Sequence, residues 1–96
     1  MIHHIVLLTF RDPGDAPEAL RRLLALPEAI PQIHTLKAGL ERTDRPDGWH
    51  LGLVTEHDDA EALRGYQEHP AHRDFLDWVR DRLAGRATLD WDDPAA

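Results

Sequence analysis

IHHIVLLTF, the stretch Ile2–Phe10, decides the fold because it has the composition of a strand that is buried on both sides. It is rich in β-branched and aromatic residues, and a turn signal, Asp12-Pro13-Gly14, follows it. Alternation along a strand divides the residues between two faces: Ile2, His4, Val6, Leu8 and Phe10 on one, and His3, Ile5, Leu7 and Thr9 on the other. Because both sets are largely apolar, we expect a central strand in a sheet with both faces covered.

The next three elements are predicted to be a helix and a hairpin. Asp15 is a suitable N-cap, and the helix would end before Pro27 or at the latest at Pro31. Ile33–Arg42 and Trp49–Glu56 then have strand patterns. The turn signal Arg45-Pro46-Asp47-Gly48 separates them, which predicts an antiparallel pair.

The C-terminal half is predicted to contain a second, interrupted helical region and a last strand. Asp58 or Asp59 would cap the helix, and Pro70 would end it and open a second segment. Gly85 is placed as a C-terminal glycine of that segment. Arg86–Trp91 is assigned to a strand, and residues 92–96 to a frayed acidic tail.

The order β-α-β-β-α-β is that of a ferredoxin-like α+β sandwich, a four-stranded antiparallel sheet with helices on one face. The chain of 96 residues is expected to be one domain, residues 1–96, with an ordered core over about 2–91. The other face of the sheet remains apolar, so we expect a homodimer that packs sheet against sheet.

Charge and composition exclude several classes of function. The formal net charge of −7 argues against nucleic acid and anionic membranes as partners. The absence of cysteine removes disulfides and thiolate chemistry and fits a cytoplasmic protein. The six glycines are scattered, so no phosphate-binding loop is expected. We expect no cofactor.

No other stretch collects as many groups that can move protons near neutral pH as Tyr66-Gln67-Glu68-His69-Pro70-Ala71-His72 does. His72 could act as a general base, with Tyr66 as hydrogen-bond donor to a carbonyl or enolate oxygen. Tyr66 and His72 are six positions apart and would not share one face of a continuous helix. The break at Pro70 starts a new helical segment, so the two side chains can point to the same site. The alternative is structural: Tyr66 packs in the core and His72 bonds a backbone carbonyl. His69 and Pro70 are assigned a structural role.

Metal binding is the other chemistry that the seven histidines suggest. His69 and His72 have a usable ligand spacing and Glu68 is adjacent, but spacing places no third ligand, so no metal site is expected. The remaining histidines, apart from His4, are assigned to the surface or to strand edges: His3, His34, His50 and His57.

Three motifs carry a resemblance to a known family: His4-Ile5-Val6-Leu7, Trp49-His50-Leu51-Gly52-Leu53-Val54, and the stretch Tyr66–His72. In these motifs the chain resembles the stress-responsive A/B barrel (Dabb) domain family. The resemblance implies a homodimer that forms a closed α+β barrel. It also implies a likeness to plant enzymes that close polyketide rings by aldol chemistry, in which Tyr66 and His72 would do the work.

The resemblance also places a ligand pocket beside these two residues. His4, Leu51, Val6 and Leu53 are assigned to its wall. The related cyclases carry a further pocket histidine at the position of Leu51, and the neighbouring His50 would face the other way.

Three functions therefore remain open. The first is a dimer that binds a hydrophobic carbonyl compound and catalyses a proton-transfer or aldol step through Tyr66 and His72. The second is a non-enzymatic, stress-related dimer that binds a small ligand or a protein partner. The third, by fold analogy alone, is a monooxygenase.

Overall fold

The computed structural model describes residues 1–43, 45 and 47–94 and places four strands and four α-helices among them. The elements are β1 (Ile2–Phe10), α1 (Ala16–Leu24), α2 (Leu26–Ala29), β2 (Thr35–Leu40), β3 (Leu51–His57), α3 (Ala60–Glu68), α4 (Pro70–Val79) and β4 (Leu83–Asp92). Short 3-10 turns precede α1 and β4.

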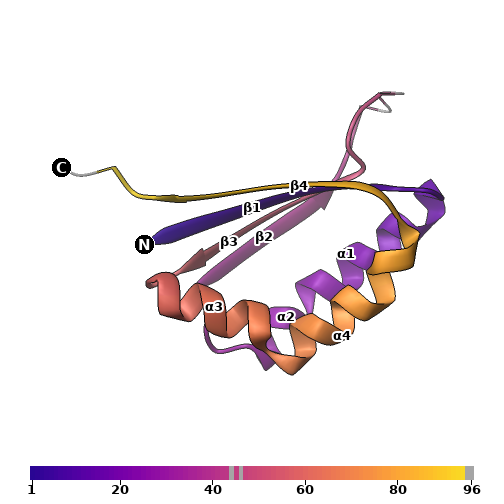
Figure 1. Ribbon diagram of the computed structural model, residues 1–96. Coiled ribbons are helices and arrows are strands. Elements are labelled where there is room, and N and C mark those ends of the chain that lie inside the picture. Colours follow the sequence, from indigo (N-terminus) through magenta and orange to yellow (C-terminus); the bar gives the residue numbers. More distant parts are fainter. Residues whose placement is uncertain (44, 46, 95–96) are drawn as a thin grey trace.

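The strands form one antiparallel sheet in the order β2-β3-β1-β4. All the helices lie on one face of this sheet (Figure 1). The predicted ferredoxin-like α+β architecture and the β2–β3 hairpin are thus confirmed. β1 is an inner strand, and its register sets His4 opposite Thr55 on β3 and Asp90 on β4.

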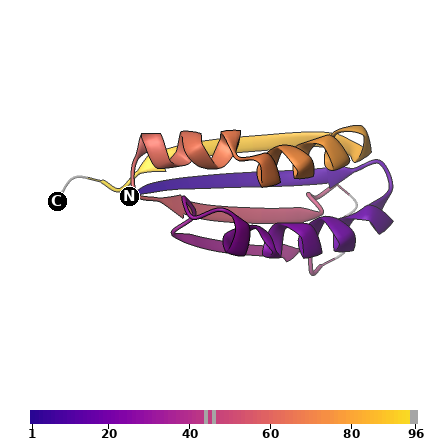
Figure 2. The same ribbon diagram turned by 90° about the horizontal axis from the view of Figure 1, so that it is seen from below.

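The core lies between the helices and the inner face of the sheet, which Figure 2 shows from the helix side. Burial alternates along β1 and β3, as period-two packing against a helical layer requires. Val6, Leu8 and Leu53 therefore join Leu23 of α1 and Phe75 of α4 in one buried cluster. Burial of this cluster drives the sheet and the helices together.

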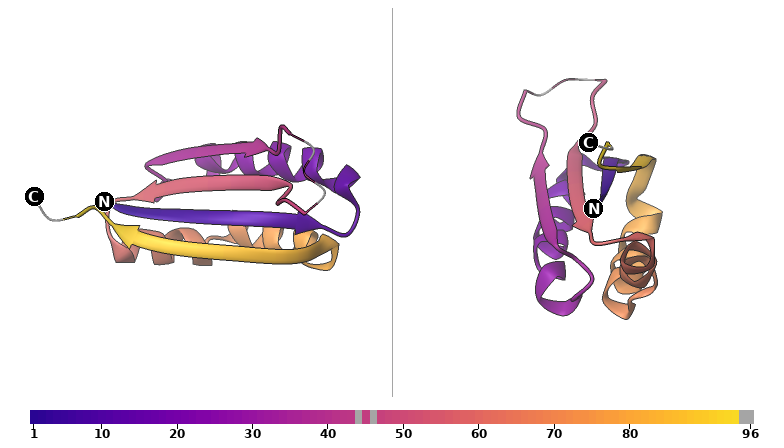
Figure 3. Two further views of the ribbon diagram at one scale, coloured as in Figure 1. Left: turned by 90° about the horizontal axis from the view of Figure 1, so that it is seen from above. Right: turned by 90° about the vertical axis from the view of Figure 1, so that its left-hand side faces the viewer.

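The outer face of the sheet carries apolar side chains that no helix covers. The left view of Figure 3 shows this face in front, with the helices behind it. Ile5, Leu7 and Val54 are half-buried there, while Leu89 and Trp91 on β4 are 62% and 41% exposed. A second cover, as predicted from the composition of β1, would have to come from outside this chain.

The break between α3 and α4 has a local cause. Asp59 caps α3, because its carboxylate accepts a hydrogen bond from the N–H of Ala62. The proline at position 70 favours extended backbone at the residue before it, and His69 has φ −64° and ψ 138°. The Nδ1 of His69 then accepts a 3.1 Å hydrogen bond from the N–H of Ala71 and caps α4. Pro70 occupies the first turn of α4, where a missing N–H does little harm.

The C-terminal elements differ from the prediction in one respect. Gly85 does not end a helix: α4 stops at Val79, and Gly85 lies inside β4 opposite Thr9. β4 starts earlier than predicted because Leu83 pairs with Phe10 across a register shift. A Cβ at Gly85 would lie 3.2 Å from the Thr9 side chain, so glycine at this position eases the close approach of the two strands and does not cap a helix.

The predicted tail and turn fall partly outside the described residues. Asp92 belongs to β4, and the N–H of Asp93 donates to the carbonyl of Met1, so the tail is not frayed at these two positions. Residues 95 and 96 of the tail, and residue 46 of the turn, lie outside the described part of the chain. Among the described helices, none is both long enough and apolar enough to cross a membrane.

Candidate functional site

A cavity of about 450 Å³ lies between the sheet and the pair α3–α4. Val6, Leu8 and Leu53 line it from the sheet, and Phe75 and Val79 from α4. Its polar side chains come from β1, α3, α4, the 3-10 turn after α4, and β4; they are His4, Tyr66, Gln67, His72, Arg80, Arg86, Thr88 and Asp90. An apolar cleft with a few converging polar groups is the usual form of a small-molecule site.

Tyr66 and His72 meet on the wall of this cavity. Their ring centroids are 4.5 Å apart, so the break at Pro70 does bring two residues six positions apart onto one site. The Nδ1 of His72 donates a 3.0 Å hydrogen bond to the carbonyl of Gln67. In a neutral ring this leaves the lone pair on Nε2. Burial lowers the pKa of His72 most strongly, and this outweighs the opposing effect of the bond to Gln67.

The phenol of Tyr66 is held in its protonated form. Burial raises its pKa to about 12, and the residue is only 1% exposed. No described residue forms a hydrogen bond with its hydroxyl, although it lines the cavity. Tyr66 can therefore donate a hydrogen bond to a ligand oxygen at neutral pH, and His72 can accept a proton.

His4 also lines the cavity and belongs to a dyad that the sequence did not indicate. Its Nδ1 donates a 2.5 Å hydrogen bond to the carboxylate of Asp90, the residue opposite it on β4. This bond fixes the ring orientation and, in the neutral form, leaves the Nε2 lone pair available. The His4 ring lies 6.0 Å from that of Tyr66. A second histidine base thus stands beside the first pair.

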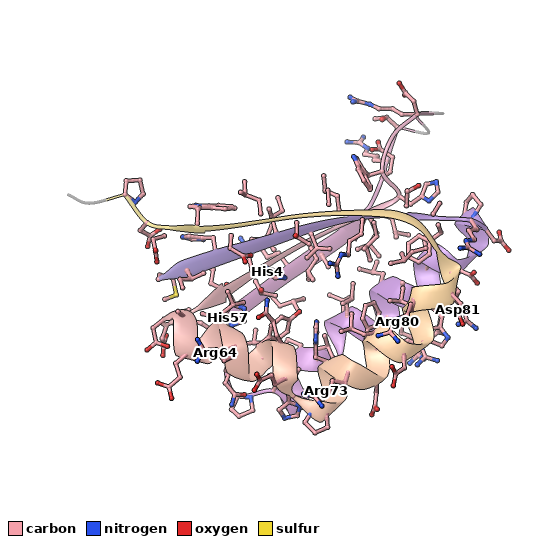
Figure 4. All side chains as sticks on the ribbon, viewed as in Figure 1. His4, His57, Arg64, Arg73, Arg80 and Asp81 are labelled. Atoms are coloured by element: carbon pink, nitrogen blue, oxygen red, sulfur yellow. The ribbon has the colours of Figure 1, made fainter. Side chains whose placement is uncertain are left out.

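The assignment of His57 to the surface was wrong. His57 is fully buried between β3 and α3, and its ring lies 4.8 Å from Tyr66 (Figure 4). Its Nδ1 donates to the carbonyl of Gln32, and its Nε2 accepts from the hydroxyl of Thr55, both at 2.8 Å. Burial lowers the pKa of His57, so the ring is held neutral behind the tyrosine.

The other predicted residues divide between the cavity and the rest of the fold. Val6 and Leu53 line the cavity, but Leu51 is buried in the core and is not part of its lining. His34 is exposed, as expected, and His50 is half-buried at the end of β1, where its Nδ1 accepts from the N–H of Phe10. His69 caps α4 by accepting a hydrogen bond from the N–H of Ala71, and it is not part of the cavity lining.

The positions of Glu68, His69 and His72 do not form a metal site. Over the described residues, no three histidine, aspartate or glutamate side chains stand close enough to hold an ion. His4 and His72 are instead each tied to a single partner, Asp90 and the Gln67 carbonyl.

Comparison with known proteins gives a match over nearly the whole chain. A family model described as the stress responsive A/B barrel domain matches residues 2–93. An uncharacterised protein of Streptomyces coelicolor is 34% identical over 91 residues, covering 82% of this chain and 94% of that protein.

Solved structures share the fold. A dimeric ferredoxin-like protein of unknown function from Thermobifida fusca has a TM-score of 0.82 at 28% identity, over 94% of this chain and 88% of that one. A putative antibiotic biosynthesis monooxygenase from Nitrosomonas europaea has a TM-score of 0.78 at 18% identity, over 97% and 98% of the two chains. The second likeness shows the fold alone.

Proposed function

Since this chain belongs to the stress responsive A/B barrel domain family, we propose that it is a dimer whose cavity binds an apolar carbonyl compound and moves a proton beside the carbonyl. The observation that carries the proposal is the contact of Tyr66 with His72 on the wall of a 450 Å³ cavity. A hydrogen-bond donor and a neutral base at one site are the two parts that enolate chemistry needs.

The steps follow from the protonation states. The Nε2 of His72 takes a proton from the carbon next to the carbonyl, and the electrons of the broken C–H bond form an enolate. The Tyr66 hydroxyl donates a hydrogen bond to the enolate oxygen. In a substrate with a second carbonyl, the enolate carbon attacks it and forms a C–C bond. The resulting alkoxide receives the proton back from His72, which closes an aldol cycle.

A non-enzymatic ligand-binding dimer is the alternative that the same cavity supports. The two functions differ in one observable. A binding protein would hold a carbonyl compound without exchanging its α-protons, whereas the proposed base would exchange them. The monooxygenase hypothesis has only the shared fold in its favour.

The test is deuterium exchange into a medium-chain methyl ketone in D₂O, followed by proton NMR. We expect the protein to accelerate loss of the α-proton signal, with saturation as the ketone fills the cavity. Saturable binding without exchange would support the binding protein and overturn the enzymatic proposal. Absence of both would remove the cavity as a site for carbonyl compounds.

The exchange rate should depend on pH in a defined way. The acid limb of kcat/KM should have its midpoint below the ordinary histidine value of about 6.5, because the pKa of His72 is lowered. No decline is expected near pH 10, the ordinary tyrosine value, because the pKa of Tyr66 is about 12. The profile is measured by the exchange assay. An acid midpoint above 6.5 would contradict His72 as the base.

The dimer part of the proposal rests on the apolar outer face of the sheet, and the solved relative from Thermobifida fusca is described as dimeric. We expect light scattering to give twice the chain mass of 10.9 kDa. Leu89→Asp should yield monomers, because it would bury a charge between the sheets. Leu24→Asp is the matched control, since Leu24 is 52% exposed on α1, away from that face. A monomeric wild type would refute the dimer.

A further inference from the structure

The cavity contains a cation that has no partner in the described part of the chain. Arg86 lies on the inner face of β4, opposite Leu8 of β1, and lines the cavity. Its guanidinium forms no hydrogen bond and no ion pair within 4.0 Å with any described residue. Four other arginines form ion pairs within 4.0 Å among the described residues: Arg21 and Arg22 with Glu18, Arg80 with Asp77, and Arg82 with Asp15.

The other charged groups of the cavity form no ion pair with Arg86 and have partners of their own. Asp90 lies on the same face of β4, but its carboxylate is engaged by His4 at 2.5 Å. Arg80, the residue after α4, also lines the cavity and is paired with Asp77 at 3.8 Å. Among the charged side chains that line the cavity, Arg86 is therefore the one without an ion-pair or hydrogen-bond partner in the described part of the chain.

Arg86 lines the same cavity as the proposed base, His72. Its positive charge contributes to the lowered pKa of His72, after burial and the charge of His4. An anion bound by Arg86 would therefore share the cavity with the carbon from which His72 takes its proton. The apolar lining formed by Phe75, Leu76 and Val79 extends along α4 and suits a hydrocarbon chain.

We propose that Arg86 binds a carboxylate of the ligand, so that the substrate class is a β-keto carboxylic acid with an apolar chain. This inference rests on the proposed function and names the substrate of that same site. A carboxylate next to the reacting carbon opposes proton loss, because a second negative charge develops beside it. A guanidinium on the carboxylate offsets that repulsion and, with two parallel N–H donors, orients the acid.

The experiment compares binding of a medium-chain β-keto acid with that of its methyl ester by isothermal titration calorimetry. The wild-type protein should bind the acid about ten- to a hundredfold more tightly than the ester. Arg86→Gln should reduce this preference to about threefold or less. Arg86→Lys should retain part of it, because the lysine ammonium keeps the positive charge but lacks the two parallel N–H donors of the guanidinium. Arg86 is exposed, so circular dichroism should show an unchanged fold in both variants.

Arg73→Gln is the matched control. Arg73 follows His72 on α4 but is exposed and is not part of the cavity lining, so the preference for the acid should be unchanged (Figure 4). If the wild type binds acid and ester equally, the inference about Arg86 fails while the carbonyl site stands. A preference that survives Arg86→Gln but disappears in Arg80→Gln would likewise overturn the assignment. If neither compound binds and no α-proton exchange occurs, the proposed function itself fails.

Discussion

Replacing His72 with alanine should lower the rate of α-proton exchange by about 100- to 10,000-fold, the range that a positioned general base contributes. The imidazole is half-buried, and its Nδ1 is held by the Gln67 carbonyl, so no water molecule would replace it with the same basicity and direction. The effect should fall on kcat, with KM for the ketone changed little, because the ring acts on the proton rather than on the hydrocarbon chain. The exchange assay in D₂O measures both constants.

Tyr66→Phe separates the donor from the base. It removes only the hydroxyl, keeps the buried ring, and should lower kcat by about 100-fold, as loss of one oxyanion donor does. The acid limb of the pH profile should remain in this variant and disappear in His72→Ala. His34→Ala serves as the control, since His34 is exposed and is not part of the cavity lining. Full activity in both Tyr66→Phe and His72→Ala would refute the assignment of Tyr66 as the hydrogen-bond donor and His72 as the base.

His57→Ala should lower the free energy of unfolding by about 3 to 4 kcal/mol. The substitution leaves a cavity behind Tyr66, and the Thr55 hydroxyl and the Gln32 carbonyl lose their hydrogen bonds to the ring. Urea denaturation measures the change. His34→Ala, an exposed histidine, should change the free energy by no more than about 0.5 kcal/mol. A loss below about 1 kcal/mol in His57→Ala would contradict the packing role.

The same residue makes stability depend on pH. The pKa of His57 in the folded protein is below that in the unfolded chain, so the unfolded state takes up the proton first. Its contribution to stability is complete above about pH 6.5 and is lost as the pH falls toward the folded pKa. His72 acts in the same direction. The His57→Ala variant should therefore show a shallower fall in unfolding free energy below pH 6.5 than the wild type.

The topology was predictable because several local signals agree on it. The apolar strand Ile2–Phe10, the hairpin turn and the break at Pro70 each have one strong local cause. Tyr66 and His72 could be paired in advance because the proline resets the helical phase between them. These inferences needed no knowledge of which distant segments touch.

What the prediction missed depends on where strands end and how they align. The predicted strand ended at Glu56, so His57 was not counted among its residues. In the structure β3 extends to His57, which continues the set of buried alternate residues Leu51, Leu53 and Thr55. One more residue of the same period would have placed it in the core. Asp90 meets His4 only through the β1–β4 register, and a slip of one position would turn its side chain to the other face. No local pattern fixes that register.

β4 combines two properties that bear on how relatives of this protein could diverge. It is an edge strand, and its inner face borders the cavity with exposed side chains at positions 84, 86, 88 and 90. Substitution of these exposed residues changes the free energy of folding little. Val6 and Leu8 on the neighbouring strand are buried, so packing restricts which residues can replace them. Alternate residues stand about 6.7 Å apart. Moving a charge by two positions would therefore change the length of chain accepted by about five carbon–carbon bonds, so selectivity could evolve through single substitutions on one strand.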